Sequence, residues 1–361
     1  MLHGSKVYIL ALLQAFLLAK LAESAMSSCP RDEKCTRLVS CSPLMRILKP
    51  TGMTQAERDV FAHRQCGLDP HGSELLHKIY VCCPELGDVL PSNQSCGPAP
   101  PEFLTPSGGH AVLNEYPWLA LLLYENRLSL TWDQETSCVG SLINSRYVLT
   151  AAHCVTGDYL THKDLVVKSV RLGEHNKSTN PGCITLDSGH HHCAPPHLQV
   201  NVDQVIVHHG FFSMGTTVLN DIALLRLQFP VRYTKQIRPI CLVDADTHLQ
   251  GLRIASWDAT GGIQTVIMST MKERNPYDCL ISYPHFHPVS QMCASGERKR
   301  DTCVAMSGSP LMGIKERNLH GFFFLAGIST YGQQPCYSPG VPEVYTKTGY
   351  FLEWIKANLG P

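Results

Sequence analysis

The chain has 361 residues, enough for one large domain with smaller additions, and 44% of them are hydrophobic, an ordinary fraction for a globular protein. Thirty Lys and Arg side chains balance thirty Asp and Glu side chains, so charge does not favour binding to nucleic acid or an anionic membrane. Sixteen cysteines, scattered in pairs, instead predict disulfides and hence secretion, because disulfides persist in oxidising compartments.

The N-terminus has the features of a secretory signal peptide. Lys6 precedes a thirteen-residue apolar run, 7–19, and small residues follow near Ala22 and Ala25. A basic segment, an apolar segment and a cleavage site of small residues form a signal peptide, and this run is short for a membrane span. We expect residues 1–25 to be removed and the mature protein to be extracellular. An uncleaved membrane anchor is the alternative.

Two Asn-x-Ser sequences are candidate glycosylation sites. They begin at Asn93 and Asn176. Such sequences accept N-linked sugar only in secreted proteins, so both predictions depend on the signal peptide.

A cluster of six cysteines follows the signal peptide and spans 55 residues: Cys29, Cys35, Cys41, Cys66, Cys82 and Cys83. A module this small buries too little apolar surface to fold on its core alone, so three disulfides would supply the stability. Spacing alone leaves fifteen pairings open. We expect a small disulfide-rich domain at residues 26–84.

Residues 85–107 are rich in Pro, Ser and Gly, a composition that predicts an extended and poorly packed linker.

From residue 108 onward, short apolar runs alternate with turn residues, which predicts an all-β barrel or sandwich. The expected strands are 118–124, 141–149, 165–172, 200–207, 222–227 and 322–331. Near the end, Tyr350, Trp354 and Ile355 fall at helical spacing and predict a terminal helix.

Three segments resemble those of chymotrypsin-like (S1) serine proteases. Thr-Ala-Ala-His-Cys contains His153, Asp-Ile-Ala-Leu-Leu begins with Asp221, and Ala-Met-Ser-Gly-Ser-Pro at 305–310 contains Ser307. Their order, His then Asp then Ser, is the order of this family. The resemblance covers residues 108–361. It implies two antiparallel β-barrels with the three residues at their interface, and a C-terminal helix.

The adjacent Cys82 and Cys83, followed by Pro84, resemble the end of the clip domains that precede arthropod serine proteases. Clip domains dock and regulate and carry no chemistry of their own, although a disulfide knot without a specific partner is the alternative. The two resemblances imply the pairs Cys29–Cys82, Cys35–Cys66, Cys41–Cys83, Cys96–Cys241, Cys138–Cys154, Cys183–Cys193, Cys279–Cys293 and Cys303–Cys336.

The family resemblance assigns a role to each residue of the triad. A serine hydroxyl is a weak nucleophile until a neighbouring base accepts its proton, so Ser307 would be the nucleophile and His153 the base. Asp221 would orient the imidazole and stabilise its charged form. The backbone N–H groups of Ala305 and Ser307 would form the oxyanion hole.

The substrate pocket has conflicting signals. Asp301 stands at the family's pocket floor, where an aspartate selects Arg or Lys, and Thr330 and Gly332 belong to the wall. Glu343 replaces a glycine that leaves the pocket open. Its carboxylate would add bulk and like charge beside Asp301, so one of the two acids would resist ionisation. Alternatively, Glu343 turns outward.

The resemblance also predicts impaired catalysis. In this family, a cut after Arg or Lys frees an ammonium group that pairs with an aspartate preceding the nucleophile. Here Met306 holds that aspartate's position, residues 105–109 (Thr-Pro-Ser-Gly-Gly) occupy the cut site, and residues 79–126 contain no Lys or Arg. An unpaired buried charge is costly, so the loss of both partners is self-consistent. Ala305 is also less permissive of unusual dihedrals than the family's glycine.

We therefore expect a secreted, non-catalytic cofactor or adaptor in an extracellular proteolytic cascade of innate immunity or development. Its partners would be other secreted clip-domain proteases or their substrates, with no nucleic acid and no membrane. No cofactor or metal is expected: the three histidines 190–192 predict a solvated loop. The alternatives are an active trypsin-like endopeptidase that cleaves after Arg or Lys, and a structural secreted glycoprotein.

Overall fold

The structure is a computed structural model. It describes residues 29, 33–45, 48, 61, 63–71, 75–83, 87–92, 94–99, 110–185, 191–215, 217–258, 264–296, 306–317, 320–332 and 342–360. The expected signal peptide, the segment 105–109 and several predicted site residues lie outside the described residues: Asn93, His190, Asp301, Cys303, Ala305 and Cys336.

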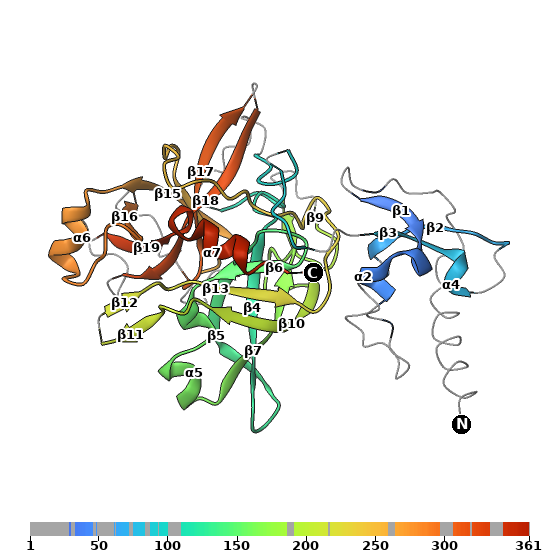
Figure 1. Cartoon of the computed structure of the whole chain (residues 1–361), viewed down its shortest axis with the longest axis horizontal. Helices are drawn as coiled ribbons and strands as arrows, with labels where there is room; N and C mark the ends of the chain where they lie inside the picture. The colour runs from blue at the N-terminus through green and yellow to red at the C-terminus, as the bar shows by residue number, and fades with distance from the viewer. Residues whose placement is uncertain are drawn as a thin grey trace.

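The N-terminal module is a small three-stranded antiparallel sheet with short helices, coloured blue in Figure 1. The sheet order is β1-β3-β2, and the elements are β1 (Lys34–Arg37), η1 (Leu38–Ser40), α2 (Ser42–Met45), β2 (Gln65–Leu68), α4 (Leu75–Lys78) and β3 (Ile79–Cys83). Disulfides join Cys29 to Cys82, Cys35 to Cys66 and Cys41 to Cys83. These bridges and a few buried side chains such as Leu38, Leu44 and Val81 hold the module together.

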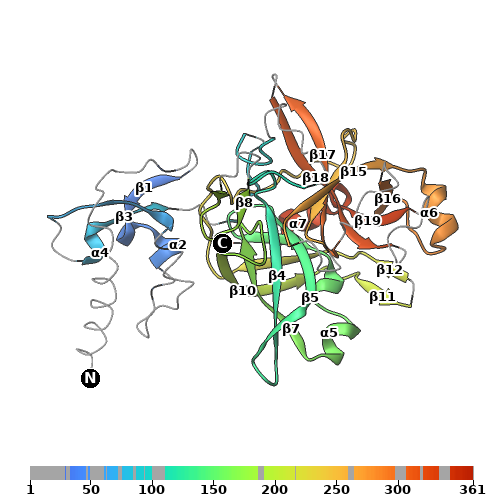
Figure 2. The ribbon, with the colours of Figure 1, turned by 180° about the vertical axis from the view of Figure 1, so that it is seen from behind.

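Two closed antiparallel barrels of six strands each form the body of the protein (Figures 1 and 2). The first contains β4 (Leu119–Asn126), β5 (Trp132–Leu142), β6 (Tyr147–Thr150), β7 (Leu165–Leu172), β10 (Leu198–Val207) and β13 (Ala223–Leu227). The second contains β14 (Arg253–Ser256), β15 (Ile267–Glu273), β16 (Gln291–Gly296), β17 (Pro310–Arg317), β18 (His320–Tyr331) and β19 (Glu343–Lys347). The predicted all-β fold of two antiparallel barrels is thereby confirmed.

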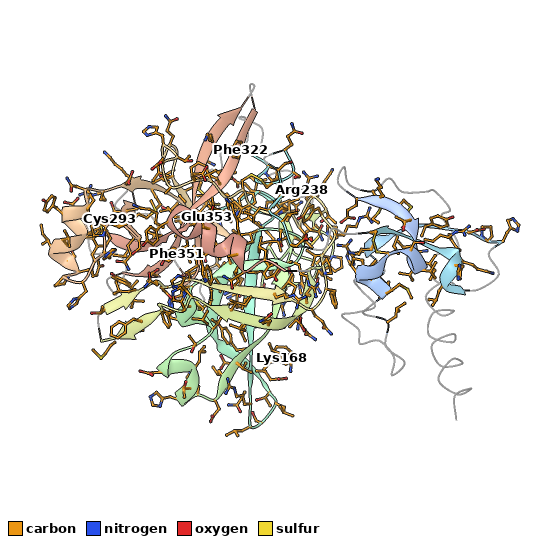
Figure 3. The ribbon with its side chains drawn as sticks, viewed as in Figure 1. Lys168, Arg238, Cys293, Phe322, Phe351 and Glu353 are labelled. Atoms are coloured by element: carbon orange, nitrogen blue, oxygen red, sulfur yellow. A yellow bond between two sulfur atoms is a disulfide. The ribbon has the colours of Figure 1, made fainter. Side chains whose placement is uncertain are left out.

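Short elements decorate the barrels: η3 (Ala152–Cys154), α5 (Asp158–His162), β8 (Cys183–Thr185), β9 (His191–Cys193), β11 (Phe212–Met214), β12 (Thr217–Leu219), α6 (Pro276–Ser282), η4 (Thr348–Phe351) and α7 (Leu352–Ala357). The predicted terminal helix is α7, which buries Leu352 and Ile355 and half-buries Trp354. Tyr350, which the helical spacing also included, lies before α7 in η4 and is exposed. Phe351 at the end of η4 is also buried, next to α7 (Figure 3). No helix in the described parts of the chain has the length and apolar character needed to cross a bilayer.

Four further disulfides brace the body: Cys96–Cys241, Cys138–Cys154, Cys183–Cys193 and Cys279–Cys293. The last of these joins α6 to β16, where Cys293 is labelled in Figure 3. None of the cysteines that the structure describes is free.

The predicted strand at 141–149 was wrong, because a turn divides it into the end of β5 and the whole of β6. In this turn, the Asn144 side-chain oxygen accepts the backbone N–H groups of Arg146 and Tyr147. Ile143 within the turn is fully buried. The apolar run therefore continues through the turn, and its composition alone does not reveal the break.

The expectation of a poorly packed linker was wrong where the linker meets the second barrel, at Cys96 and Gly97, which are buried, whereas Asp88, Val89, Ser92 and Gln94 are exposed. The Gly97 N–H donates to the Pro239 carbonyl oxygen, and the Phe323 N–H donates to the Gly97 carbonyl oxygen, each at 2.8 Å. Gly97 has φ +55°, and a Cβ at this position would lie 1.9 Å from the Phe323 oxygen. The neighbouring Cys96 is only 4% exposed and is bonded to Cys241. Pro and Gly here allow the chain to lie close against the second barrel.

The run of histidines also differs from the expected loop. His191 and His192 belong to β9, which pairs with β8 in a short hairpin whose ends the Cys183–Cys193 disulfide joins. His192 is exposed, so its imidazole remains solvated as expected.

Candidate active site

His153 and Asp221 meet because β6 and β13 are neighbouring strands of the first barrel. Thr150 at the end of β6 pairs with Ala223 at the start of β13. His153 follows in η3, and Asp221 lies just before β13. The Asp221 carboxylate is fully buried, with one oxygen 2.7 Å from His153 Nδ1 and the other accepting the His153 backbone N–H at 2.9 Å. Both carboxylate oxygens therefore fix the histidine segment.

Asp221 also raises the pKa of His153. Burial of the imidazole lowers its pKa, but the attraction and hydrogen bond of the Asp221 carboxylate outweigh burial and raise the pKa above its ordinary value. The His153 side chain is 28% exposed, so part of the ring is open to solvent. This pairing is what a general base needs, and it also satisfies a buried aspartate in a protein without activity.

We expect the His153 ring to titrate above the ordinary histidine pKa in the natural protein and clearly lower in Asp221→Asn. Because the folded-state pKa is raised, the pair stabilises the fold fully below the unfolded-state pKa, and this stability is lost as pH rises through the folded-state pKa. NMR titration of the imidazole rings measures the His153 pKa in the natural protein and in Asp221→Asn. His208, whose pKa is lowered by burial and then by His209, is the internal control. An unchanged His153 pKa in the variant would contradict the assignment.

Ser307 lies between the two barrels. Its carbonyl oxygen accepts the N–H of Val139 on β5 of the first barrel at 2.9 Å, and the Gly308 N–H donates to Ser329 on β18 of the second at 2.9 Å. Val139 follows Cys138, whose disulfide leads to Cys154 next to His153. The half-buried Ser307 and the histidine segment are thus fastened to the same strand.

Two threonines connect Asp221 to the second barrel. Thr346 Oγ1 on β19 donates to the Asp221 carbonyl oxygen at 3.0 Å, and Thr330 Oγ1 on β18 lies 2.9 Å from Thr346 Oγ1. All three side chains are buried. Thr330 was expected in the pocket wall, whereas Thr346 was not anticipated, because a threonine in a strand is too common to attract notice.

Met306, directly before Ser307, is only 2% exposed and belongs to the main apolar core, the cluster that also contains Trp257 and Val266. A thioether in this place gains from apolar packing and offers no charge. An ionic group brought to this position would be desolvated without a counter-charge from residue 306.

Ser309, two residues after Ser307, is accommodated by a second serine. Its hydroxyl donates to Ser256 Oγ on β14 at 2.9 Å, and both residues are fully buried. A buried hydroxyl without a partner would be unfavourable, so Ser256 makes serine tolerable at 309. Sequence reasoning missed Ser256, because 53 residues separate the two and neither lies in a recognisable pair motif.

The Glu343 side chain points inward, so the outward alternative is excluded. The Tyr345 hydroxyl donates to Glu343 Oε2 at 2.5 Å. A Cβ placed on Gly332 would lie 3.0 Å from Glu343 Cγ, so the glutamate stem lies against Gly332. Burial raises the pKa of Glu343, and the Tyr345 hydrogen bond opposes this in part. The glutamate therefore occupies space beside the expected pocket wall.

Asn176 belongs to a compact turn. Its side-chain oxygen accepts both the N–H and the hydroxyl of Ser178, at 3.1 and 2.7 Å, while its own N–H donates to Glu174. Asn176 is half-buried and Ser178 is exposed. The site therefore reaches the surface of the first barrel, as a glycosylation acceptor must.

Comparisons with known proteins agree with this architecture. The family model described as Trypsin matches residues 106–355, and that of the regulatory CLIP domain of proteinases matches residues 31–83. The Spaetzle-processing enzyme of Drosophila melanogaster is 36% identical over 94% of this chain and 93% of its own length. Melanization protease 1 of the same species is 30% identical over 90% of each chain.

Among solved structures, the Drosophila Grass clip serine protease of the Toll pathway is 25% identical, with a TM-score of 0.62 over 92% of this chain and 97% of that one. The fold, the two domain matches and the order of the triad segments lead to one assignment. The chain belongs to the trypsin family of serine proteases, within the group whose members carry a clip domain.

Proposed function

We propose that this protein is a secreted clip-domain protease homologue with impaired catalysis that acts as an adaptor or cofactor in an extracellular proteolytic cascade. The observation that carries the proposal is the burial of Met306 in the apolar core immediately before Ser307. In the family this position supplies the charge that orders the loop after cleavage.

The physical reason is the cost of an unpaired buried charge. A newly freed ammonium group next to Met306 would find no anion at residue 306, and desolvating such a charge costs several kcal/mol. Residues 79–126 also offer no Lys or Arg to a trypsin-like activator. In this proposal a cut in the chain would therefore not order the loop that carries Ser307.

The intact His153–Asp221 pair is compatible with this proposal. A buried aspartate with both oxygens bonded stabilises the first barrel whether or not the neighbouring serine reacts. In the proposal the described residues of the triad and pocket wall serve to bind a peptide rather than to cleave it: His153, Asp221, Ser307, Thr330, Gly332 and Glu343. The predicted roles of Ala305 in the oxyanion hole and of Asp301 at the pocket floor concern residues outside the described part of the chain. Glu343 lies against Gly332, and we propose that its side chain hinders the entry of a long Arg or Lys side chain.

The cascade setting comes from the relatives. One is named for processing Spaetzle, another for melanization, and the structural neighbour is assigned to the Toll pathway. We propose that this chain acts beside such proteases or their substrates outside the cell. The proposal of secretion depends on the expected signal peptide and on the disulfides.

The test is covalent labelling of the purified secreted protein with a fluorophosphonate probe, before and after treatment with several proteases. We expect no labelling above that of Ser307→Ala, together with a change in the rate at which a partner clip protease cleaves its substrate. Strong labelling dependent on Ser307, with hydrolysis of an arginine ester, would establish the active endopeptidase instead. If the protein is not labelled and also has no effect on a partner protease, that result would favour a structural glycoprotein.

A further inference from the structure

Arg64 of the clip domain is fully buried, which is rare for an arginine unless it is paired. Its Nε donates to the carbonyl oxygen of Pro230 in the protease domain at 3.1 Å. Its Nη1 donates to the Cys82 carbonyl oxygen at 2.9 Å and to the carboxylate of Glu33, itself 4% exposed, at 3.2 Å. One guanidinium group thus binds two residues of its own clip domain and one backbone carbonyl of the protease domain.

The protease domain makes the reciprocal contact. Arg232, two residues after Pro230, donates from Nη1 to the carbonyl oxygen of His63 at 2.6 Å. The two contacts are therefore reciprocal. Arg64 of the clip domain binds a carbonyl oxygen near Arg232, and Arg232 of the protease domain binds a carbonyl oxygen next to Arg64. Carbonyl acceptors in fixed backbone demand a defined relative position, which a loosely tethered module would not satisfy.

The segment that leaves the clip domain is fixed as well. Asn144 Nδ2 donates to the carbonyl oxygens of Gly87 and Val89, at 2.8 and 3.1 Å. Gly87 has φ +80°, and a Cβ there would lie 2.6 Å from Arg146 Cβ. The apolar core is also continuous, since Leu44 of the clip domain belongs to the same cluster as the first barrel. Figures 1 and 2 show the clip domain beside that barrel.

We propose that Arg64, with Arg232 opposite, holds the clip domain in one fixed position on the first barrel. The two domains then present a single continuous surface to a partner protein, and the clip domain separates only by an all-or-none opening. This proposal goes beyond the adaptor role and is independent of whether Ser307 reacts.

The disulfides provide a direct readout of opening. The three clip bridges lie within residues 29–83, and Cys96 is bonded to Cys241. A cut between residues 84 and 95 therefore frees the clip domain on a non-reducing gel, whereas a cut after Cys96 leaves it attached. Thermolysin, which cleaves beside apolar residues, has Leu90 as a target in this interval, and Leu90 packs against the main apolar core. Val89 is 53% exposed, so it is replaced by Ser in every protein tested to make release depend on opening.

In the full-length secreted protein, we expect Arg64→Gln to accelerate clip release by thermolysin about 100-fold, because it removes the buried guanidinium that joins the clip domain to the Pro230 carbonyl oxygen. Arg232→Gln, which leaves the clip core untouched, is expected to accelerate release about tenfold. Arg37→Gln is the matched control. Arg37 is a half-exposed clip arginine bonded to Tyr80 and Asp69, and its loss should leave release unchanged.

Equal release rates for Arg64→Gln and Arg37→Gln would overturn the proposal. Faster release for Arg64→Gln but not for Arg232→Gln would also overturn it, because that result indicates an unfolded clip domain rather than an opened interface. X-ray scattering should show a larger radius of gyration for both interface variants. Fluorophosphonate labelling should stay unchanged in all three variants, which separates this test from that of the adaptor role.

Discussion

Met306→Asp is expected to lower the free energy of unfolding by about 3 kcal/mol or more, whereas Met306→Leu should lower it by less than about 1.5 kcal/mol. Met306 is 2% exposed within the main apolar core. A carboxylate there would be desolvated, and residue 306 gains no cation because no cleavage site precedes it in residues 79–126. Leucine has nearly the same volume and polarity as methionine, so it serves as the control.

Denaturant unfolding of the two variants, with disulfides intact, measures this difference. If Met306→Asp were as stable as the natural protein, an ammonium or other cation would have to lie near residue 306. The adaptor proposal would then lose its main support, because the loop could still be ordered by an ion pair. If Met306→Asp were also labelled by the fluorophosphonate probe, the absence of a charge at residue 306 would be the sole reason that Ser307 is unreactive in the natural protein.

The sequence predicts the strands of the first barrel better than those of the second. The run 165–172 is β7 itself, and 222–227 differs from β13 by one residue, because Leu and Val make up most of both strands. In the second barrel, β14 to β17 and β19 were not anticipated. β15, Ile267–Glu273, mixes Ser, Thr and Lys with its apolar residues, and its burial comes from packing rather than from an obvious apolar run.

Some residues of the candidate site could likewise be predicted from the sequence, and others could not. His153 and Asp221 could be found because each lies in a motif whose neighbours are also recognisable. Thr346 and Ser256 could not, since their importance arises from contacts made across the fold with Asp221 and Ser309. The direction of the Glu343 side chain likewise depends on its hydrogen bond to Tyr345, a residue that sequence reasoning had not connected with the pocket.

The interface of the clip domain was beyond sequence reasoning for a related reason. A linker rich in Pro and Gly predicts loose packing, but those residues also suit a chain that lies close to another backbone, as Gly97 does against Phe323. Arg64 stands among ordinary surface-type residues in the sequence. Only the folded chain places its guanidinium at Pro230, 166 residues away.

The second large effect concerns Gly308, which follows Ser307 and has φ +82°. A Cβ at this position would lie 2.0 Å from the Val139 carbonyl oxygen and 2.6 Å from Thr150 Oγ1. Gly308→Ala is expected to lower the free energy of unfolding by about 4 kcal/mol, of which the left-handed backbone alone accounts for about 1 to 2 kcal/mol. The remainder reflects displacement of the loop from β5.

Gly215→Ala separates these two contributions. Gly215 also has positive φ, +59°, but a Cβ there meets no atom within 4 Å. Its substitution should therefore cost only about 1 kcal/mol in the same denaturant assay. Equal losses for the two variants would mean that the loop carrying Ser307 can move away from Val139 without penalty. Its hydrogen bonds to Val139 and Ser329 would then not be what positions the serine between the barrels.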